Sequence, residues 1–282
     1  MAGNHFYMPE LPEVETIKKD LFSKIFRKKI KRVEVLERAV VQNPLKDFED
    51  NLRGNFFTDI NRVGKLLIFS LQSGGKVLFA HLGMTGQLVY VRADSALGRF
   101  TRVAIYFAGG SALFFNDIRK FGYLKLVREE EKGAVIAKSF GMDALSPYFT
   151  AGKLKEFFSR RKGSLLKAAL LDQKLLAGIG NIYADEICFD AGILPSRKAG
   201  LLSFAEISRL YKSIKKILIK AVKNRGTSFR NYVDASGKSG NFLRHLKVYR
   251  REGRSCLKCK QSVIRKIILA GRGTRYCPSC QK

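Results

Sequence analysis

Four of the five cysteines fall in the last 27 residues and form two closely spaced pairs. Cys256 and Cys259 are two residues apart, 17 residues follow, and Cys277 and Cys280 repeat the spacing. This pattern is typical of a four-thiolate zinc site, which joins chain segments too small to form a core. The alternatives are free thiols or two disulfides, which a reducing compartment disfavours. Because four protein ligands close the coordination shell, the sequence predicts one structural Zn²⁺ ion.

The charge of the chain points to a polyanionic partner. Lys and Arg total 53 against 24 Asp and Glu, which gives the 282 residues a net charge of +29. Such an excess favours DNA, RNA or an anionic membrane. No apolar run approaches the ~18 residues of a membrane span, and residues 1–7 lack the basic and apolar parts of a secretory signal. We therefore expect a cytoplasmic protein without a membrane role.

The first half of the chain has the pattern of a β-rich domain that follows one helix. Apolar residues recur at helical spacing from about residue 12 to 26. Gly74-Gly75 and Gly109-Gly110 have the composition of hairpin turns, so the region 29–128 predicts an antiparallel sandwich or barrel. The strands are expected over residues 31–36, 66–71, 76–80, 87–91, 102–107 and 112–115.

The hydrophobic period changes at about residue 150, where a helical region begins. Cys188 stands alone in this region and is expected to be a buried thiol. From about residue 247 the chain returns to short strands around the four paired cysteines. The helices are expected over residues 151–161, 165–171, 183–191 and 204–224.

A motif near the start of the chain carries a family resemblance. Residues 8–16 read Met-Pro-Glu-Leu-Pro-Glu-Val-Glu-Thr, and the chain closely resembles the bacterial formamidopyrimidine-DNA glycosylases over about residues 8–282. Members of this family excise oxidised purines and nick the resulting abasic site. The resemblance implies an α+β fold, with an N-terminal antiparallel β-sandwich flanked by helices and a C-terminal helix–two-turns–helix domain with a zinc-bound β-hairpin. The further matching motifs are residues 62–65, 81–86, 117–122, 171–186 and the zinc hairpin.

The resemblance also implies how the chain is divided into domains. The expected parts are an N-terminal extension at residues 1–8, a catalytic β-sandwich at 9–132, a linker at 133–149, a helix–two-turns–helix DNA-binding domain at 150–246 and a zinc finger at 247–282. Catalytic roles follow for Pro9 as the nucleophile, Glu10 as the general acid/base, Lys65 as a phosphate contact that supports the chemistry, and Arg272 on the zinc hairpin.

The chemistry of a terminal proline agrees with the role that the resemblance implies for Pro9. A free α-amine has a pKa of about 8, so more of it is unprotonated at neutral pH than of a lysine. Its attack on C1′ of the damaged nucleotide expels the base, and the resulting iminium acidifies the C2′ proton. Loss of that proton drives β-elimination and then δ-elimination of the phosphates.

The chain departs from the family at its beginning, because seven residues precede Met8. If translation starts at Met1, the nitrogen of Pro9 is an amide and is not nucleophilic. We expect that translation starts at Met8 and that Met8 is then removed. The alternative is a retained extension on a protein that binds lesions without the proline chemistry.

The resemblance further assigns residues that hold and open the DNA, because a glycosylase must extrude its target nucleotide. His81 and Asn181 are expected to contact phosphates, although a histidine in isolation is more often a core residue. Asn181 follows a Gly-Ile-Gly turn at the expected start of a helix, where an anion is favoured. Met84 and Phe121 are expected to enter the stack as apolar wedges, with Arg119 bonded to the orphaned base.

A last motif resembles the base-capping loop of the family. Ser228, Asn231 and Tyr232 belong to it and are expected to read the oxidised purine. Arg225 replaces a glycine that is often found at its position, and Ser228 and Asn231 stand where the family varies. The preference among lesions therefore stays open.

These features together predict a bifunctional DNA glycosylase and abasic-site lyase of base excision repair. Its expected partner is damaged double-stranded DNA, bound by a monomer in the nucleoid. One alternative is an endonuclease VIII-type enzyme for oxidised pyrimidines, although that branch has Gly where Leu11 stands. The other is a non-catalytic DNA-binding protein, for which the charge of +29 would suffice.

Overall fold

The computed structural model describes residues 8–228, 234–235 and 237–282. They form two compact units, each described here by itself. The first unit holds the chain up to residue 138 and residues 224–241, and the second holds residues 139–223 and 242–282. The chain thus returns to the first unit after most of the second is complete.

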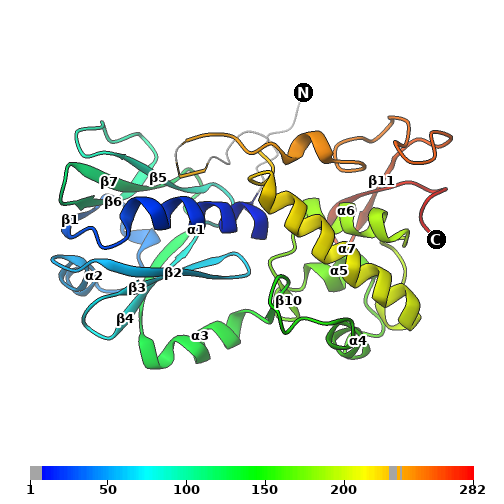
Figure 1. The fold of residues 1–282 in the computed structure, drawn as a ribbon, viewed down its shortest axis with the longest axis horizontal. Helices are drawn as coiled ribbons and strands as arrows, with labels where there is room; N and C mark the ends of the chain where they lie inside the picture. Colours follow the sequence, from blue (N-terminus) through cyan, green and yellow to red (C-terminus); the bar gives the residue numbers. More distant parts are fainter. Residues whose placement is uncertain (1–7, 229–233, 236) are drawn as a thin grey trace. The chain divides into compact units, whose positions relative to one another are not determined.

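Unit 1 is built on two four-stranded antiparallel sheets (Figure 1). One has the strand order β1-β6-β7-β5, formed by Ile30–Val35, Thr101–Phe107, Ser111–Asp117 and Gly86–Arg92. The other has the order β2-β3-β4-β8, formed by Phe57–Val63, Leu66–Leu71, Lys76–His81 and Tyr123–Arg128. The expected antiparallel β-sandwich is confirmed.

Both expected hairpin turns are present. Gly74 and Gly75 connect β3 to β4 with φ values of 85° and 55°, and Gly109 and Gly110 connect β6 to β7 with 88° and 75°. Glycine reaches this left-handed region without the clash that a Cβ atom causes. The apolar pattern did not predict strands β2 and β8. Polar residues interrupt it in both strands, for example Asp59 in β2 and Lys125 in β8.

The core of unit 1 lies between the sheets and helix α1 (Leu11–Ile25). The helix presents Val14, Ile17, Leu21 and Ile25 at helical spacing, and all four are buried. It contacts β2 and β3 of one sheet and β5 of the other. The unit also contains helix α2 (Leu45–Leu52), which the sequence analysis did not predict, and the 3₁₀ turns η1 (Arg38–Val40) and η2 (Glu129–Glu131).

Unit 2 is mainly helical. Its helices α4, α5, α6 and α7 cover Ala151–Ser159, Leu166–Leu171, Asn181–Ala191 and Phe204–Lys223, close to the expected ranges. A short parallel pair joins β9 (Met142–Asp143) to β10 (Leu176–Ala177). Helix α3 (Lys132–Ser139) lies at the boundary, and all but its last residue belong to unit 1. The remaining elements are η3 (Ala199–Leu201), η4 (Phe242–His245) and a hairpin of β11 (Arg265–Leu269) and β12 (Arg272–Tyr276).

Cys188 on α6 has no exposed surface, as expected of a buried thiol. Among the described helices, none has the length and apolar composition that crossing a bilayer requires.

Candidate functional site

The start of α1 places two predicted catalytic residues next to each other in a buried position. Pro9 is buried directly before the helix, and Glu10 is its N-cap with 3% of its surface exposed. The Glu10 side chain accepts a hydrogen bond from the backbone N–H of Glu13. The Glu13 carboxylate in turn accepts a hydrogen bond from the Glu10 N–H at 2.9 Å. Pro12 suits the first turn because its ring fixes a helical φ. The capping box therefore fixes the backbone that follows Pro9.

Glu13 also binds a distant segment of the same unit. Its second carboxylate oxygen accepts the backbone N–H of Thr227 at 2.7 Å, and 2% of the residue is exposed. A Cβ atom at Gly226 would lie 2.6 Å from this oxygen, so the close approach requires glycine there. Glu13 thus joins the first turn of α1 to the segment that precedes Ser228.

Lys65 lies in the two-residue turn between β2 and β3, where Gly64 has a φ of 58°. Only 4% of Lys65 is exposed. Arg62 fixes this turn, because it donates to the Gly64 carbonyl at 2.9 Å and to Glu15 on α1 at 2.8 Å. The turn and the first half of α1 are therefore held together by a largely buried ion pair.

His81 ends β4 and pairs with Leu66, the residue after Lys65. Burial lowers the pKa of His81 to about 4, and the positive charge of Lys65 contributes to the shift. Its Nδ1 accepts a hydrogen bond from the Gly83 N–H at 3.1 Å. Its ring stacks on that of Tyr123, with 5.5 Å between the ring centres. At neutral pH His81 is therefore a neutral ring whose remaining proton sits on Nε2, where it can be donated.

The two predicted wedge residues, Met84 and Phe121, lie on neighbouring loops together with Arg119. Met84 is in the turn between β4 and β5, and Arg119 and Phe121 are in the loop between β7 and β8. The Arg119 guanidinium lies 3.1 Å from the Met84 sulfur and 4.5 Å from the Phe121 ring centre. Phe121 is 56% exposed, which is unusual for a phenylalanine and leaves an apolar surface beside a cation.

Asp117 organises these two loops from a fully buried position. Its carboxylate accepts the hydroxyl of Thr85 and the backbone N–H groups of Arg119 at 3.1 Å and Gly122 at 2.8 Å. Thr85 in turn accepts from the Arg119 N–H at 3.0 Å. A carboxylate that accepts several donors holds both loops in one conformation.

The predicted base-capping loop is described only at its two ends. Ser228 accepts the Gly240 N–H at 2.8 Å, whereas Asn231 and Tyr232 lie outside the described residues. Arg225 has a φ of 60°, the left-handed conformation that explains why a glycine suits this position. Both ends of the loop belong to unit 1.

In unit 2, the predicted phosphate-binding turn precedes α6. The Gln173 side chain shapes it by donating to Ile179 O at 2.7 Å and accepting Gly178 N–H at 2.9 Å. Asn181, the first helical residue, donates through Nδ2 to the Tyr249 hydroxyl at 3.4 Å. Its Oδ1 is buried and has no hydrogen-bond partner among the described residues. The turn therefore presents a helix start and an incompletely satisfied amide.

The hairpin of β11 and β12 is fixed to α6 by a buried ion pair. Lys167 donates to Asp185 at 2.6 Å and to the carbonyl of Gly273 on β12 at 3.0 Å, and Asp185 accepts the Arg275 N–H at 3.0 Å. Burial raises the pKa of Asp185 to about 7 and lowers that of Lys167. The exposed Arg272 at the start of β12 is thus carried on a firmly anchored strand.

The next residue on α6, Glu186, anchors a second segment. It is 2% exposed and accepts the backbone N–H groups of Lys247, Val248 and Tyr249 at 2.8–3.0 Å. Burial raises the pKa of Glu186, and these three donors oppose the shift. The backbone around Tyr249, the partner of Asn181, is therefore fixed by α6.

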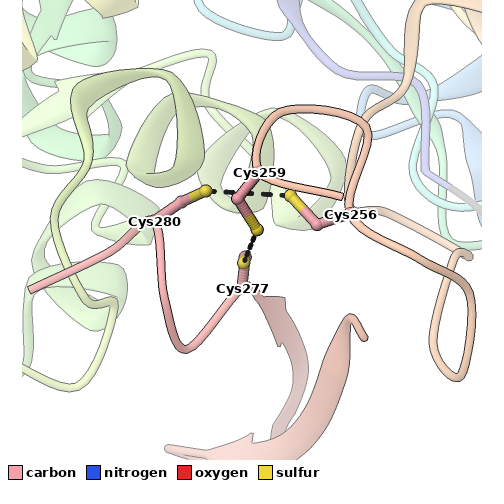
Figure 2. Close-up of side chains that lie close together, drawn as sticks. All are labelled: Cys256, Cys259, Cys277 and Cys280. Carbon is pink, nitrogen blue, oxygen red and sulfur yellow. Dashed lines mark hydrogen bonds between the residues drawn. The ribbon is translucent and has the colours of Figure 1, made fainter. Parts of the chain in front are cut away.

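The four paired cysteines converge in space, as Figure 2 shows. Their sulfur atoms all lie within 4.8 Å of one another, with 3.8 Å between Cys256 and Cys280 and 3.7 Å between Cys259 and Cys277. These separations exceed a disulfide bond of about 2.05 Å and match the roughly 3.8 Å edge of a tetrahedron of sulfurs around Zn²⁺. The cluster can hold one metal ion.

The structure divides the predicted site residues between the two units. Unit 1 brings Met84, Arg119 and Phe121 together, and places Lys65 beside the strand pair that ends at His81. The members in unit 1 are Pro9, Glu10, Lys65, His81, Met84, Arg119, Phe121 and Ser228. The members in unit 2 are Asn181, Arg272, Cys256, Cys259, Cys277 and Cys280.

The residues that hold the predicted site residues in place were not predicted from the sequence. For Lys167 a signal existed, because a lysine within the apolar run 165–171 must be buried and needs a partner. Asp117 also left a signal, since an aspartate at a strand end two residues before Arg119 favours an Asx turn. The bond from Glu13 to Thr227 left none, since 214 positions separate the two.

Comparisons with known proteins agree with this architecture. The formamidopyrimidine-DNA glycosylase N-terminal domain matches residues 8–124, and the H2TH domain of the same enzymes matches residues 140–232. The formamidopyrimidine-DNA glycosylase of Carboxydothermus hydrogenoformans is 44% identical over 276 residues, which cover 98% of this chain and all of that protein.

Solved structures give the same result. A Lactococcus lactis Fpg variant in complex with DNA containing Fapy-dG is 33% identical, with a TM-score of 0.90 over 97% of this chain and all of the other. The Lactococcus lactis Fpg in complex with DNA containing an abasic site is 34% identical, with a TM-score of 0.90 over 97% and 99% of the two chains. With its sandwich, its helical unit and its cysteine cluster, the chain belongs to the formamidopyrimidine-DNA glycosylase family, whose members act in DNA repair.

Proposed function

We propose that this DNA glycosylase removes oxidised purines, namely 8-oxoguanine and formamidopyrimidines, and then cleaves the abasic site as a lyase. The observation that carries the proposal is the position of Pro9 and Glu10, adjacent and buried at the capped start of α1. The relatives solved with Fapy-dG DNA and with abasic-site DNA support the substrate class and the second step.

The proposed reaction begins at the nitrogen of Pro9, once Met8 has been removed. The nitrogen lone pair attacks C1′, the bond from C1′ to the base breaks, and the base leaves with the bonding electrons and takes up a proton. Glu10 protonates the sugar ring oxygen as the ring opens, and an iminium forms between Pro9 and C1′. Removal of the C2′ proton then breaks the bond to the 3′ phosphate, and a second elimination releases the 5′ phosphate.

Four side chains are proposed to grip phosphates around the lesion. Lys65 and Arg272 supply positive charge, and Arg272 offers a planar fork that matches phosphate oxygens. His81 supplies a neutral donor, because its ring is not protonated at neutral pH. Asn181 supplies an amide at the start of α6, where the helix dipole favours an anion.

The exposed wedge and the capping segment complete the proposed site. Met84 and Phe121 fill the gap left by the extruded nucleotide, and Arg119 bonds the orphaned base, with a preference for cytosine. Ser228, together with Asn231 and Tyr232 of the same segment, contacts the extruded purine.

We also propose that the ion held by the four cysteines is one structural Zn²⁺. Cys256, Cys259, Cys277 and Cys280 supply four soft ligands in a tetrahedral arrangement, which leaves no position for substrate. The ion would join the two ends of the hairpin that carries Arg272. Elemental analysis of purified protein tests this, since we expect one zinc per chain and any other stoichiometry or metal contradicts it.

The functional parts are proposed to be a catalytic sandwich at residues 9–132, a linker at 133–149, a helix–two-turns–helix domain at 150–246 and a zinc finger at 247–282. Within the third part, residues 224–241 belong to the compact unit of the sandwich, so the capping segment is proposed to act with the catalytic domain. We further propose that a monomer acts in the cytoplasm, at the nucleoid, because its substrate is there. Light scattering of the protein alone and on a lesion duplex tests the monomer.

Borohydride trapping tests the proposed chemistry. Protein expressed from Met8 is first checked by intact mass for a chain that begins at Pro9. It is then incubated with duplexes containing 8-oxoguanine opposite cytosine or thymine glycol, with and without borohydride. We expect a covalent adduct and β,δ-elimination products on the 8-oxoguanine duplex, because borohydride reduces the iminium.

Two variants separate the possible outcomes. A chain that keeps Met8 and the residues before it makes the Pro9 nitrogen an amide and should abolish most trapping, whereas Pro12→Ala in a chain that begins at Pro9 should retain it. Dominant cleavage of thymine glycol would favour an endonuclease VIII-type enzyme. Binding without any adduct, from a chain with a verified terminus, would favour a non-catalytic DNA-binding protein and reject the proposal.

A further inference from the structure

Arg225 has a backbone conformation that its residue type disfavours. Its φ of 60° lies in the left-handed region, where the Cβ atom of an L-residue is crowded, and such positions persist only when the surroundings hold them. What holds Arg225 is its guanidinium, whose Nη2 lies 2.5 Å from both Asp20 on α1 and Asp234. The chain thus keeps a strained arginine that makes two ion pairs at once.

The second partner of Arg225, Asp234, is a buried carboxylate that depends on this ion pair. Only 2% of its side chain is exposed, and a buried carboxylate needs a cation and hydrogen-bond donors. Arg225 supplies Nε at 3.2 Å and Nη2 at 2.5 Å, and the Lys238 N–H lies 2.9 Å from the other oxygen. Arg225 therefore joins the two described ends of the segment 224–241.

The segment is also attached to one face of α1. Glu13, Asp20 and Lys24 are spaced by seven and four residues, so their side chains share a face of the helix. Glu13 accepts the Thr227 N–H at 2.7 Å, Asp20 pairs with Arg225, and Lys24 donates to a carbonyl at 3.5 Å. That last carbonyl is in Ala235, which is buried in the core of unit 1.

We propose that Asp20 is a positioning residue that acts through Arg225 to hold the start of this segment against the helix that begins at the catalytic residues. The inference rests on the proposed function, in which Ser228 and its neighbours contact the extruded base. Loss of the Asp20 pair then impairs excision of a base. It leaves cleavage of a ready-made abasic site unchanged, because such a site has no base to position.

The test variant is Asp20→Asn, which keeps the shape of the side chain and leaves the pair between Arg225 and Asp234 in place. The matched control is Asp94→Asn, which removes the same charge from an exposed pair with Arg92 in the same unit. Single-turnover rates are measured on an 8-oxoguanine duplex and on a preformed abasic duplex. For Asp20→Asn we expect about a fivefold loss on the first and less than about a twofold change on the second.

Two more variants complete the test of Asp20. Asp20→Glu keeps a carboxylate and should recover most of the excision rate, and Asp94→Asn should equal the wild type on both duplexes. Equal losses on both duplexes, or no loss on 8-oxoguanine, would overturn the positioning role. A wild-type protein that cleaves neither duplex would instead reject the proposed function, which is a distinguishable result.

Discussion

The Lys167 ammonium lies 2.6 Å from the Asp185 carboxylate, and neither side chain is more than 1% exposed. Lys167 also reaches Gly273, and Asp185 reaches Arg275, so the pair connects helices α5 and α6 to strand β12. A buried pair of this kind gains little over an apolar pair, but the loss of one partner leaves the other buried without its counter-charge and its hydrogen bond.

Substitution of Lys167 should therefore destabilise the protein strongly. Lys167→Met leaves the Asp185 carboxyl group buried without its cation, so we expect a loss of roughly 3–5 kcal/mol in the free energy of unfolding, measured with urea. Lys153→Met, which breaks an exposed pair on α4, serves as the control and should change it little. A loss below about 1 kcal/mol for Lys167→Met would contradict the anchoring role of the pair.

Asp117 should control the conformation of the two loops that carry Met84, Arg119 and Phe121. Asp117→Asn presents an N–H₂ group to donors that now bind a carboxylate, so at least one bond from Thr85, Arg119 or Gly122 is lost. We expect a destabilisation of about 2–3 kcal/mol and weaker discrimination between cytosine and adenine opposite 8-oxoguanine. Urea unfolding and paired cleavage assays measure the two effects. Intact discrimination would show that the loops keep their conformation without the carboxylate.

His81 should make stability depend on pH. Because its folded pKa is about 4 against an ordinary 6.5, the unfolded chain binds a proton between these values that the folded chain does not. Stability is therefore lost as the pH falls from 6.5 towards 4, by about 3 kcal/mol from this group. His81→Gln removes this contribution, so the wild type should lose more stability over that range than the variant. If the free energy of unfolding, measured with urea, falls with pH equally in the wild type and in His81→Gln, the His81 ring is not buried in its neutral form.

Arg272 should contribute to DNA affinity through charge. Arg272→Ala should weaken binding to duplexes of any sequence and lower the slope of log K against log salt by about 1, because one phosphate contact is lost. His81→Gln is the useful comparison, since a neutral donor should leave the slope nearly unchanged. Fluorescence anisotropy over a salt series gives both values. An unaltered slope for Arg272→Ala would remove this residue from the interface.

The cysteine cluster should stabilise the hairpin rather than take part in chemistry. Cys277→Ser, or removal of the metal by a chelator, should release the ion and weaken DNA binding, because β11 and β12 have little core of their own. Cys188→Ser, at the cysteine outside the cluster, should keep the metal. Colorimetric detection of released metal and anisotropy follow the two effects. DNA affinity that survives complete metal loss would contradict the structural role.

The sequence alone determined the features that depend on neighbours along the chain. The spacing of the paired cysteines, the motif around Pro9 and the glycine pairs at the hairpin turns each need only a few consecutive residues to be recognised. Apolar periodicity located α1 and the helices of unit 2 for the same reason, because the helix repeat is local. Strand β2 was missed where polar residues interrupted this pattern.

Only the tertiary structure decided which polar groups are partners. Glu13 bonds to Thr227, Arg225 to Asp20, and Lys167 to Asp185, and none of these pairs follows a local spacing rule. A buried charge must find a counter-charge or a donor wherever packing brings one, and that choice depends on the whole fold. The residues expected to do chemistry were therefore readable from the sequence, while those that hold them in place became visible only in three dimensions.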